Sequence, residues 1–242
     1  MTVAYDGRNY AGWQRQRNAT TVQSVIEDAL RKIDSGPARI FASGRTDAGV
    51  HAMGQVVHLD LERDFDPATL LRALNAMLPP EIRIMKTATA ESRFDARKHA
   101  VSKEYRYFIW NDEVLPPHLH ALRTHLPGAL DETRMQTAAS CLVGRHDFAS
   151  FTANVNRTTS DTTRLLSRLD VRKRGHELTV IAVGEGFLYK MVRSLAGFLI
   201  KVGKGAESPS SAREVLASRQ RTARVPTAPP EGLYLWKVGY LP

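Results

Sequence analysis

Apolar and polar positions in the first ninety residues follow two alternating periods. Short runs of β-branched and other apolar residues predict strands at residues 2–6, 38–43, 55–62 and 82–88. Apolar side chains spaced three and four apart predict one helix after Thr20 and another after Asp66. The order β-α-β-β-α-β is typical of the split βαβ, or ferredoxin-like, arrangement.

Both helices have recognisable start signals. Thr20 and Gln23 are spaced as a capping box, and Gly36 is expected to end the first helix. The pair Asp66-Pro67 suits the start of the second helix. An apolar face at helical spacing indicates that each helix packs on a sheet.

Residues 101–242 repeat this order without visible sequence repetition. A strand is predicted at 103–110, a helix at 131–143, a hairpin at 164–183 turning at Gly175, a helix at 187–203 and a strand at 233–240. The sequence therefore predicts an α+β fold with two ferredoxin-like halves, residues 1–100 and 101–242, joined into one extended, mainly antiparallel sheet with helices packed on it. Loops are expected at 115–125, 154–163 and 203–231.

The composition is that of a soluble globular protein, with 43% hydrophobic and 24% charged residues. The chain lacks an apolar run of membrane-spanning length, and its first fifteen residues lack a secretory apolar core, so a cytoplasmic location is expected. A single cysteine, Cys141, excludes an intramolecular disulfide and a thiolate-rich zinc site, and its apolar neighbours place it in the core.

Charge points to a polyanionic partner, because 34 Lys and Arg against 25 Asp and Glu give a net charge of +9. Residues 7–20 interleave arginines with Tyr10 and Trp13, which suits an RNA surface. Trp13 fits a buried core position equally well, and the sequence leaves both interpretations open.

A glycine-bracketed turn from Ala42 to Gln55 separates two of the predicted strands. It carries Asp47 where a strand ends and the backbone bends. An aspartate there either forms the turn through its own side chain or is a working carboxylate.

Other site chemistries find little support. His118 and His120 have no third ligand in a metal-binding spacing, and neither a phosphate-binding loop nor a dinucleotide motif is present. A triad of Ser43, His51 and Asp47 lacks a nucleophile elbow. An RNA-binding module remains possible, with Tyr105 and Tyr107 as stacking platforms, although one of them is expected only to pack the core.

Several blocks together resemble the tRNA pseudouridine synthase A (TruA) family over nearly the whole chain. The blocks are, in order, YDGRNYAGWQRQ, TVQSVIEDAL, GRTDAGVHAMGQVVHLDL, LNAMLPPEI, FDARKHAVSKEYRY, HDFASF, GFLYKMVRSLAG, VGKG and EGLYL. The resemblance implies the pseudouridine synthase fold and isomerisation of uridine to pseudouridine at positions 38, 39 and 40 of the tRNA anticodon stem-loop. It also implies a homodimer, with no cofactor, no metal and no membrane partner.

By the same resemblance, roles fall on residues that match the family motifs. Asp47 is the catalytic carboxylate, Tyr105 stacks on the target base and Arg193 pairs with the aspartate. Arg45 precedes the aspartate in its motif, Leu233 lines the pocket, and Arg97 is a basic residue that contacts RNA.

The residue types suit this chemistry. Breaking a C1′–N1 bond and rejoining through C5 requires a nucleophile for the sugar or the ring, or a base for a ribose proton, and an ionised carboxylate can serve as any of these. A stacked uridine must also be flipped out, and an aromatic ring recovers part of the cost. The sequence does not choose among the three routes of attack.

Two positions depart from the family pattern, since Asp95 stands where the family usually has histidine and Lys98 where it usually has an apolar residue. Further basic residues are expected to contact RNA: Arg8, Arg15, Arg17, Arg45, Arg97 and Lys103. Four others near the hairpin tip are interpreted instead as a solvated charge run: Arg168, Arg172, Lys173 and Arg174. The competing hypothesis is a tRNA-binding or RNA-folding module without catalysis, which has no use for an ionised Asp47.

Overall fold

The computed structural model describes residues 1–34, 36, 39–153 and 161–241, arranged as two compact units. Unit 1 consists of Met1–Val101 with Tyr234–Pro242, and unit 2 consists of Ser102–Leu233. Most of the loop expected at 154–163 lies outside the described residues.

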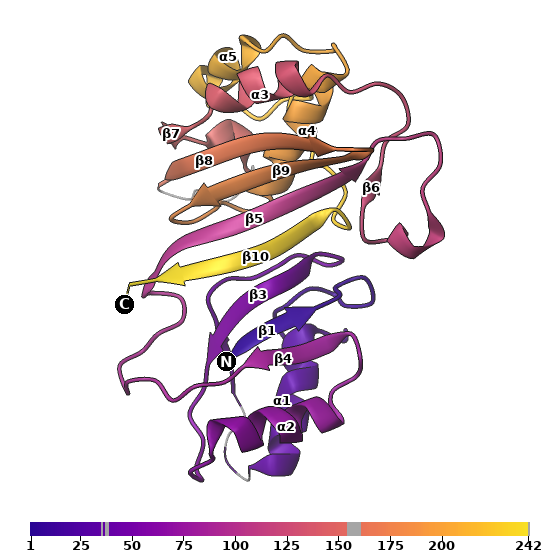
Figure 1. The fold of residues 1–242 in the computed structure, drawn as a ribbon. Helices are drawn as coiled ribbons and strands as arrows, with labels where there is room; N and C mark the ends of the chain where they lie inside the picture. Colours follow the sequence, from indigo (N-terminus) through magenta and orange to yellow (C-terminus); the bar gives the residue numbers. More distant parts are fainter. Residues whose placement is uncertain (35, 37–38, 154–160, 242) are drawn as a thin grey trace. The chain divides into compact units, whose positions relative to one another are not determined.

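Unit 1 contains both helices and all four strands predicted for the first ninety residues, together with the last strand of the chain (Figure 1). Its elements are β1 (Thr2–Tyr5), α1 (Val22–Ile33), β2 (Phe41–Ala42), β3 (His51–His58), α2 (Pro67–Met77), β4 (Ile82–Lys86) and β10 (Leu233–Tyr240). The strand order is β4-β1-β3-β10, and β2 pairs with the end of β3. The predicted order β-α-β-β-α-β is present.

The last strand is the largest difference from the expected division of the chain. Tyr234 and Leu235 of β10 pair in parallel with His51 and Ala52 of β3, so β10 belongs to the unit 1 sheet although it is last in sequence. Pairing between residues as far apart as His51 and Tyr234 leaves no local signal in the sequence. Along the chain, unit 1 ends at Val101 and unit 2 begins at Ser102.

The N-cap of helix α1 is Thr21, one residue later than the predicted Thr20. Thr21 accepts a hydrogen bond from the Ser24 N–H, and the Ser24 hydroxyl oxygen accepts one from the Thr21 N–H, so these two residues form the capping box and not Thr20 with Gln23. Gln23 is instead buried against the core. The helix ends at Ile33 with Asp34 as its C-cap, two residues before Gly36.

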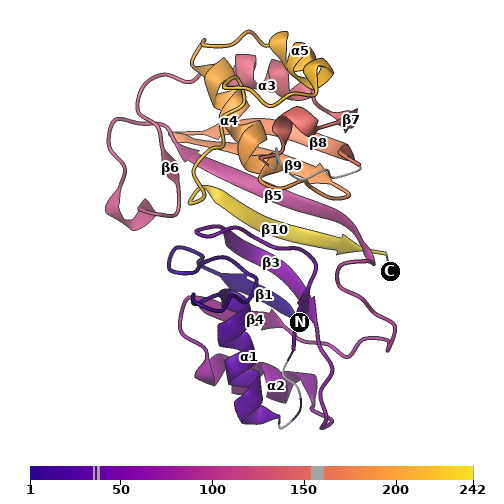
Figure 2. The ribbon, with the colours of Figure 1, turned by 180° about the vertical axis from the view of Figure 1, so that it is seen from behind.

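Unit 2 is a mainly antiparallel sheet with helices from the later part of the chain (Figure 2). Its strands are β5 (Ala100–Trp110), β6 (Thr124–His125), β7 (Gly144–Asp147), β8 (Thr163–Arg174) and β9 (Glu177–Gly184). Its helices are α3 (Glu132–Ser140), α4 (Met191–Gly203) and α5 (Ser211–Ser218), with short 3₁₀ turns at Pro117–Leu119 and Ala149–Phe151. The strand order is β5-β9-β8-β7, and β6 lies parallel to β5.

Several details of unit 2 differ from the predictions. Helix α4 begins at Met191 and not at Phe187, because Lys190 adopts a left-handed conformation with φ +56°. Cys141 caps the end of α3 and is only half-buried, so its predicted core position is wrong. Helix α5 lies within a stretch expected to be loop, while the hairpin turns at Gly175 as predicted, with φ +59°.

The α+β class and the mainly antiparallel strand pairing are confirmed. Within the described part of the chain, none of the helices has both the length and the apolar character needed to cross a membrane.

Candidate active site

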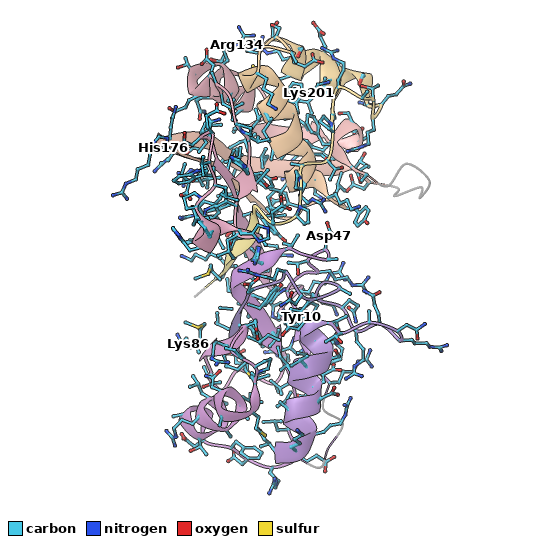
Figure 3. All side chains as sticks on the ribbon, turned by 90° about the vertical axis from the view of Figure 1, so that its right-hand side faces the viewer. Tyr10, Asp47, Lys86, Arg134, His176 and Lys201 are labelled. Atoms are coloured by element: carbon cyan, nitrogen blue, oxygen red, sulfur yellow. The ribbon has the colours of Figure 1, made fainter. Side chains whose placement is uncertain are left out.

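Asp47 lies on the loop between β2 and β3, and its side chain is half-buried (Figure 3). Its carbonyl accepts a hydrogen bond from the Val50 N–H at 3.1 Å, which closes a tight turn. Gly49 inside that turn has φ +76°, a conformation that favours glycine. The backbone on the C-terminal side of the carboxylate is thereby fixed.

A segment from the N-terminal loop holds the other side of this turn. The Trp13 N–H donates to the Thr46 carbonyl at 3.1 Å, and the Tyr5 hydroxyl is 2.8 Å from the Thr46 hydroxyl. Gly12 has φ +92°, and a Cβ there would lie 2.7 Å from the Thr46 carbonyl oxygen. Only glycine allows the two backbones to approach this closely.

Two buried polar side chains support the start of the loop. The Ser43 hydroxyl donates to Gln55 Oε1 at 2.7 Å, and Gln55 Nε2 donates to the Gly44 carbonyl at 2.8 Å. Ser43 and Gln55 are both fully buried. Ser43 is thus part of the loop scaffold, which disfavours the Ser43, His51 and Asp47 triad further.

Arg45 ends a chain of side-chain hydrogen bonds that starts at a buried carboxylate. Its Nε donates to Gln14 Oε1 at 3.1 Å, Gln14 Nε2 donates to Gln23 Oε1 at 2.8 Å, and Gln23 Nε2 donates to Glu27 Oε1 at 2.9 Å. Glu27 is 4% exposed and forms an ion pair with Arg15 at 2.7 Å. Each amide both accepts and donates, so the chain sets the orientation of the exposed Arg45 guanidinium.

Two of the arginines expected to contact RNA also form ion pairs within the protein. Arg15 is bound to Glu27 and Asp28, and the hydrogen bond that its guanidinium donates to the Glu27 carboxylate raises the pKa of Arg15. Arg8 pairs with Asp6 at 2.8 Å. Both arginines therefore have partners within the protein, and Arg8, Arg15 and Arg17 are all exposed.

Trp13, for which the sequence left two interpretations open, is 1% exposed. Its ring centroid lies 5.8 Å from that of Tyr5. The core interpretation is confirmed, and Trp13 anchors the segment that contacts the Asp47 loop.

Arg97 is exposed on a turn that Asp95 organises. The Asp95 carboxylate accepts the N–H groups of Lys98 and Arg97 at 2.9 and 2.8 Å, and these bonds hold the pKa of the Asp95 carboxyl below its usual value. The Asp95 side chain thus stabilises the turn. The Lys98 ammonium lies 3.8 Å from the Asp95 carboxylate.

In unit 2, the two tyrosines of β5 have different surroundings. Tyr105 is 8% exposed, and its ring meets the Phe187 ring edge to face with centroids 5.1 Å apart. Tyr107 is fully buried, with its hydroxyl 2.6 Å from Thr124 Oγ1, and burial raises its pKa. Tyr107 is therefore the core tyrosine of the pair, and Phe187 is a neighbour of Tyr105 that the sequence pattern missed.

Arg193 lies on the first turn of α4 and is bound to the segment that precedes β10. Its Nε donates to the Ala228 carbonyl at 2.7 Å, and the Ala228 N–H donates to the Arg193 carbonyl at 3.0 Å. A Cβ on Gly197, one turn later, would lie 2.2 Å from the Pro226 carbonyl oxygen. The glycine lets this segment lie against α4 and hold the guanidinium.

Leu233 follows the same segment and is buried. Its N–H donates to the Pro230 carbonyl at 2.9 Å. The predicted site residues are divided between the two units. Arg45, Asp47 and Arg97 belong to unit 1, and Tyr105, Arg193 and Leu233 belong to unit 2.

Within the described ranges, no cluster of three or more His, Cys, Asp and Glu side chains is suited to hold a metal ion. His118 and His120 are both exposed.

Comparison with known proteins gives consistent matches. A family model described as tRNA pseudouridine synthase matches residues 1–97 and 138–241. A tRNA pseudouridine synthase A of Chlamydia trachomatis is 44% identical over 100% of this chain and 91% of the relative. Proteins of the same name from Exiguobacterium sibiricum and Listeria welshimeri are 39% and 43% identical over 99% and 98% of this chain, and over 95% and 97% of their own lengths.

A solved structure of a Cbf5-Nop10-Gar1 complex also matches, at 13% identity and a TM-score of 0.37, over 83% of this chain and 54% of that chain. That similarity is too low to support an argument. The family model and the full-length relatives are sufficient, and they show that the chain belongs to the tRNA pseudouridine synthases, a family of isomerases.

Proposed function

We propose that this enzyme converts uridine to pseudouridine at positions 38, 39 and 40 of the tRNA anticodon stem-loop, with Asp47 as the catalytic carboxylate. One observation carries the proposal. The Asp47 backbone is fixed on both sides by the Thr46 and Val50 hydrogen bonds, while its side chain remains half-exposed. A carboxylate needed only to form its turn would not require the close approach of Gly12.

The reaction conserves all atoms of the nucleotide. The C1′–N1 bond breaks, the uracil ring turns, a C1′–C5 bond forms, and the proton on C5 is lost while N1 gains one. Asp47 starts this sequence by attacking C1′ or C6 or by taking the C2′ proton, and each route requires the ionised form. Arg193 is proposed to keep the carboxylate charged, because a guanidinium favours the ionised state of a neighbouring acid.

Tyr105 is proposed to stack on the flipped uracil and to assist removal of the C5 proton. Flipping a base costs a few kcal/mol, and stacking on an aromatic ring recovers part of that. The edge-to-face contact with Phe187 holds the Tyr105 ring in one orientation, which supports this role.

Arg45 and Arg97 are proposed to contact the RNA, and Leu233 to line the pocket. Both arginines are exposed, and the net charge of +9 favours a polyanionic substrate. We also propose a homodimer in the cytoplasm that needs no cofactor. Light scattering at micromolar concentration tests the dimer, and a monomeric mass would contradict it.

Tritium release from tRNA transcripts labelled at C5 of uridine tests the catalytic role. Wild type is expected to release tritium. Asp47→Ala and Asp47→Asn are expected to lose turnover by at least about 10⁴-fold while tRNA binding is retained. Asp60→Ala, which removes an exposed acid elsewhere in unit 1, is the matched control and should behave as wild type.

Two results would overturn the proposal: no release by wild type from any tRNA, or full turnover by the Asp47 variants. Transcripts with single uridines retained at 38, 39 or 40 test the positions separately. Release only from uridines elsewhere would keep the reaction and reject the proposed positions.

The stacking role of Tyr105 is tested by comparing Tyr105→Phe with Tyr105→Ala. The phenylalanine variant keeps the ring, so it should retain tRNA affinity while losing turnover if the hydroxyl assists proton removal. The alanine variant should lose both. Equal loss of affinity in the two variants would reject stacking.

A further inference from the structure

Lys190 has a backbone conformation that lysine rarely adopts. Its φ of +56° places it in the left-handed region, shared among non-glycine residues of the described chain only by Ala121 and Arg219. A Cβ makes this region unfavourable, and glycine or asparagine fits it better. The lysine side chain is therefore not explained by the turn it occupies.

Hydrogen bonds to the carbonyls of Tyr189 and Lys190 hold the backbone on both sides of the Lys190 Cα. The Tyr189 carbonyl accepts the Ala153 N–H at 3.1 Å and the Thr152 hydroxyl at 3.3 Å. The Lys190 carbonyl accepts both the N–H and the hydroxyl of Ser194 at 3.0 Å. Strain that the surroundings enforce is concentrated at functional positions in proteins.

The side chains at this turn form a cation and ring pair that faces solvent. Tyr189 is 51% exposed, and the Lys190 ammonium lies 5.0 Å from its ring centroid. Across the described residues, Lys190 has no carboxylate partner, whereas Arg219, which is also left-handed, pairs with Asp147 at 3.3 Å. Within the described residues, the charge of Arg219 is therefore neutralised by a neighbouring carboxylate, whereas that of Lys190 is not.

The pair also lies within the segment that carries proposed substrate contacts. Phe187, two residues before Tyr189, holds the Tyr105 ring, and Arg193 follows three residues after Lys190. An exposed aromatic ring beside an uncompensated ammonium suits a nucleobase and its phosphate. We propose that Tyr189 and Lys190 form an additional tRNA contact, in which the ring stacks on a base and the ammonium binds an adjacent phosphate. This inference rests on the tRNA substrate proposed above.

Lys190→Gly separates the role of the side chain from that of the backbone. Glycine relieves the left-handed strain, so the variant should unfold at a higher temperature than wild type. It should nevertheless bind tRNA about fivefold more weakly, with the slope of log K against log salt reduced by about one. Lys190→Arg keeps the charge and should bind as wild type.

Arg219→Gly is the matched control, because it removes a positive charge from a left-handed position in the same unit. We expect it to leave tRNA affinity and the salt slope unchanged. Tyr189→Ala should weaken binding about tenfold without changing the salt slope, and Tyr189→Phe should bind as wild type.

All binding is measured with inactive Asp47→Asn protein as well as wild type, so that a failure of the proposed catalytic role leaves these measurements interpretable. Lys190→Gly with wild-type affinity and salt slope would overturn the proposal. An equal loss in Arg219→Gly would also overturn it, because net charge and not this contact would then explain the effect.

Discussion

The Asp47 loop and the start of helix α4 hold their proposed functional side chains by different means. Asp47 lies in irregular backbone that is fixed by hydrogen bonds from a distant loop, through the close approach at Gly12. Arg193 lies on a regular helix, and its guanidinium donates to the Ala228 carbonyl of the segment that precedes β10. A loop offers close access to a substrate but needs tertiary contacts to become rigid, whereas a helix supplies rigidity by itself.

This comparison predicts that the Asp47 loop is the more fragile of the two regions. Gly12→Ala places a Cβ against the Thr46 carbonyl and should displace the Asp47 loop, lowering kcat by about 100-fold. Gly128→Ala is the control, since Gly128 also has positive φ but nothing within 4 Å of its Cβ position. An alanine at either position must adopt a positive φ, and the unfolding temperatures of the two variants measure the cost of that backbone strain. A kcat in Gly12→Ala within twofold of its control would show that the loop tolerates the displacement.

The corresponding change in unit 2 is expected to have a smaller effect. Gly197→Ala pushes the Pro226 carbonyl away from α4, and should loosen the Ala228 contact with Arg193 while the helix itself persists. We expect kcat to fall about tenfold. Gly186→Ala, with open space at its Cβ position, should leave turnover unchanged. A larger loss in Gly197→Ala than in Gly12→Ala would reverse the comparison.

A variant that breaks the hydrogen-bond chain to Arg45 tests whether tertiary contacts also set the orientation of an exposed side chain on the Asp47 loop. Gln14→Leu removes the acceptor for Arg45 Nε, so KM for tRNA should rise about fivefold, while kcat changes by less than twofold. Gln16→Leu, on the same N-terminal loop, removes only a bond to the Ala11 carbonyl and should leave KM unchanged. Equal KM values for the two variants would show that Arg45 needs no such orientation.

The smallest expected effect concerns a second loop aspartate, which contrasts with Asp47. Asp95→Ala removes the acceptor for two backbone N–H groups, and should cost about 1 kcal/mol of unfolding free energy at pH 7 without changing kcat. The folded-state pKa of Asp95 is lowered, so its stabilisation is present above the unfolded value near 4 and is lost as pH falls through the folded pKa. Urea unfolding of both proteins at pH 7 and pH 3 measures this. A difference that persists undiminished at pH 3 would exclude the charged form as its source.

Local patterns were sufficient for most of the helices and strands. The apolar periodicity of residues 22–33 and the Asp66-Pro67 start of α2 act within one turn of helix, so they can be read without tertiary information. The pattern failed where one residue was decisive. The apolar periodicity predicted that the helix begins at Phe187, but the left-handed backbone of Lys190 delays its start to Met191. A lysine in the sequence gives no indication of a left-handed conformation.

The two tyrosines of β5 show a similar limit for the site. Alternation places Tyr105 and Tyr107 on the same side of the strand, and the sequence could say only that one of them packs the core. The Thr124 and Pro229 contacts made by the Tyr107 hydroxyl come from distant segments, and they decide which one it is.

The sequence by itself determined the element order, the basic charge and the family motifs with Asp47 at the centre of a glycine-bracketed turn, because each of these depends on neighbouring residues. Only the tertiary structure decided that β10 joins the first sheet, that Trp13 is buried in the core, and that Arg15 forms an ion pair with Glu27. Each of these depends on partners far away in the chain, whose approach is set by packing and hydrogen bonding of the folded units.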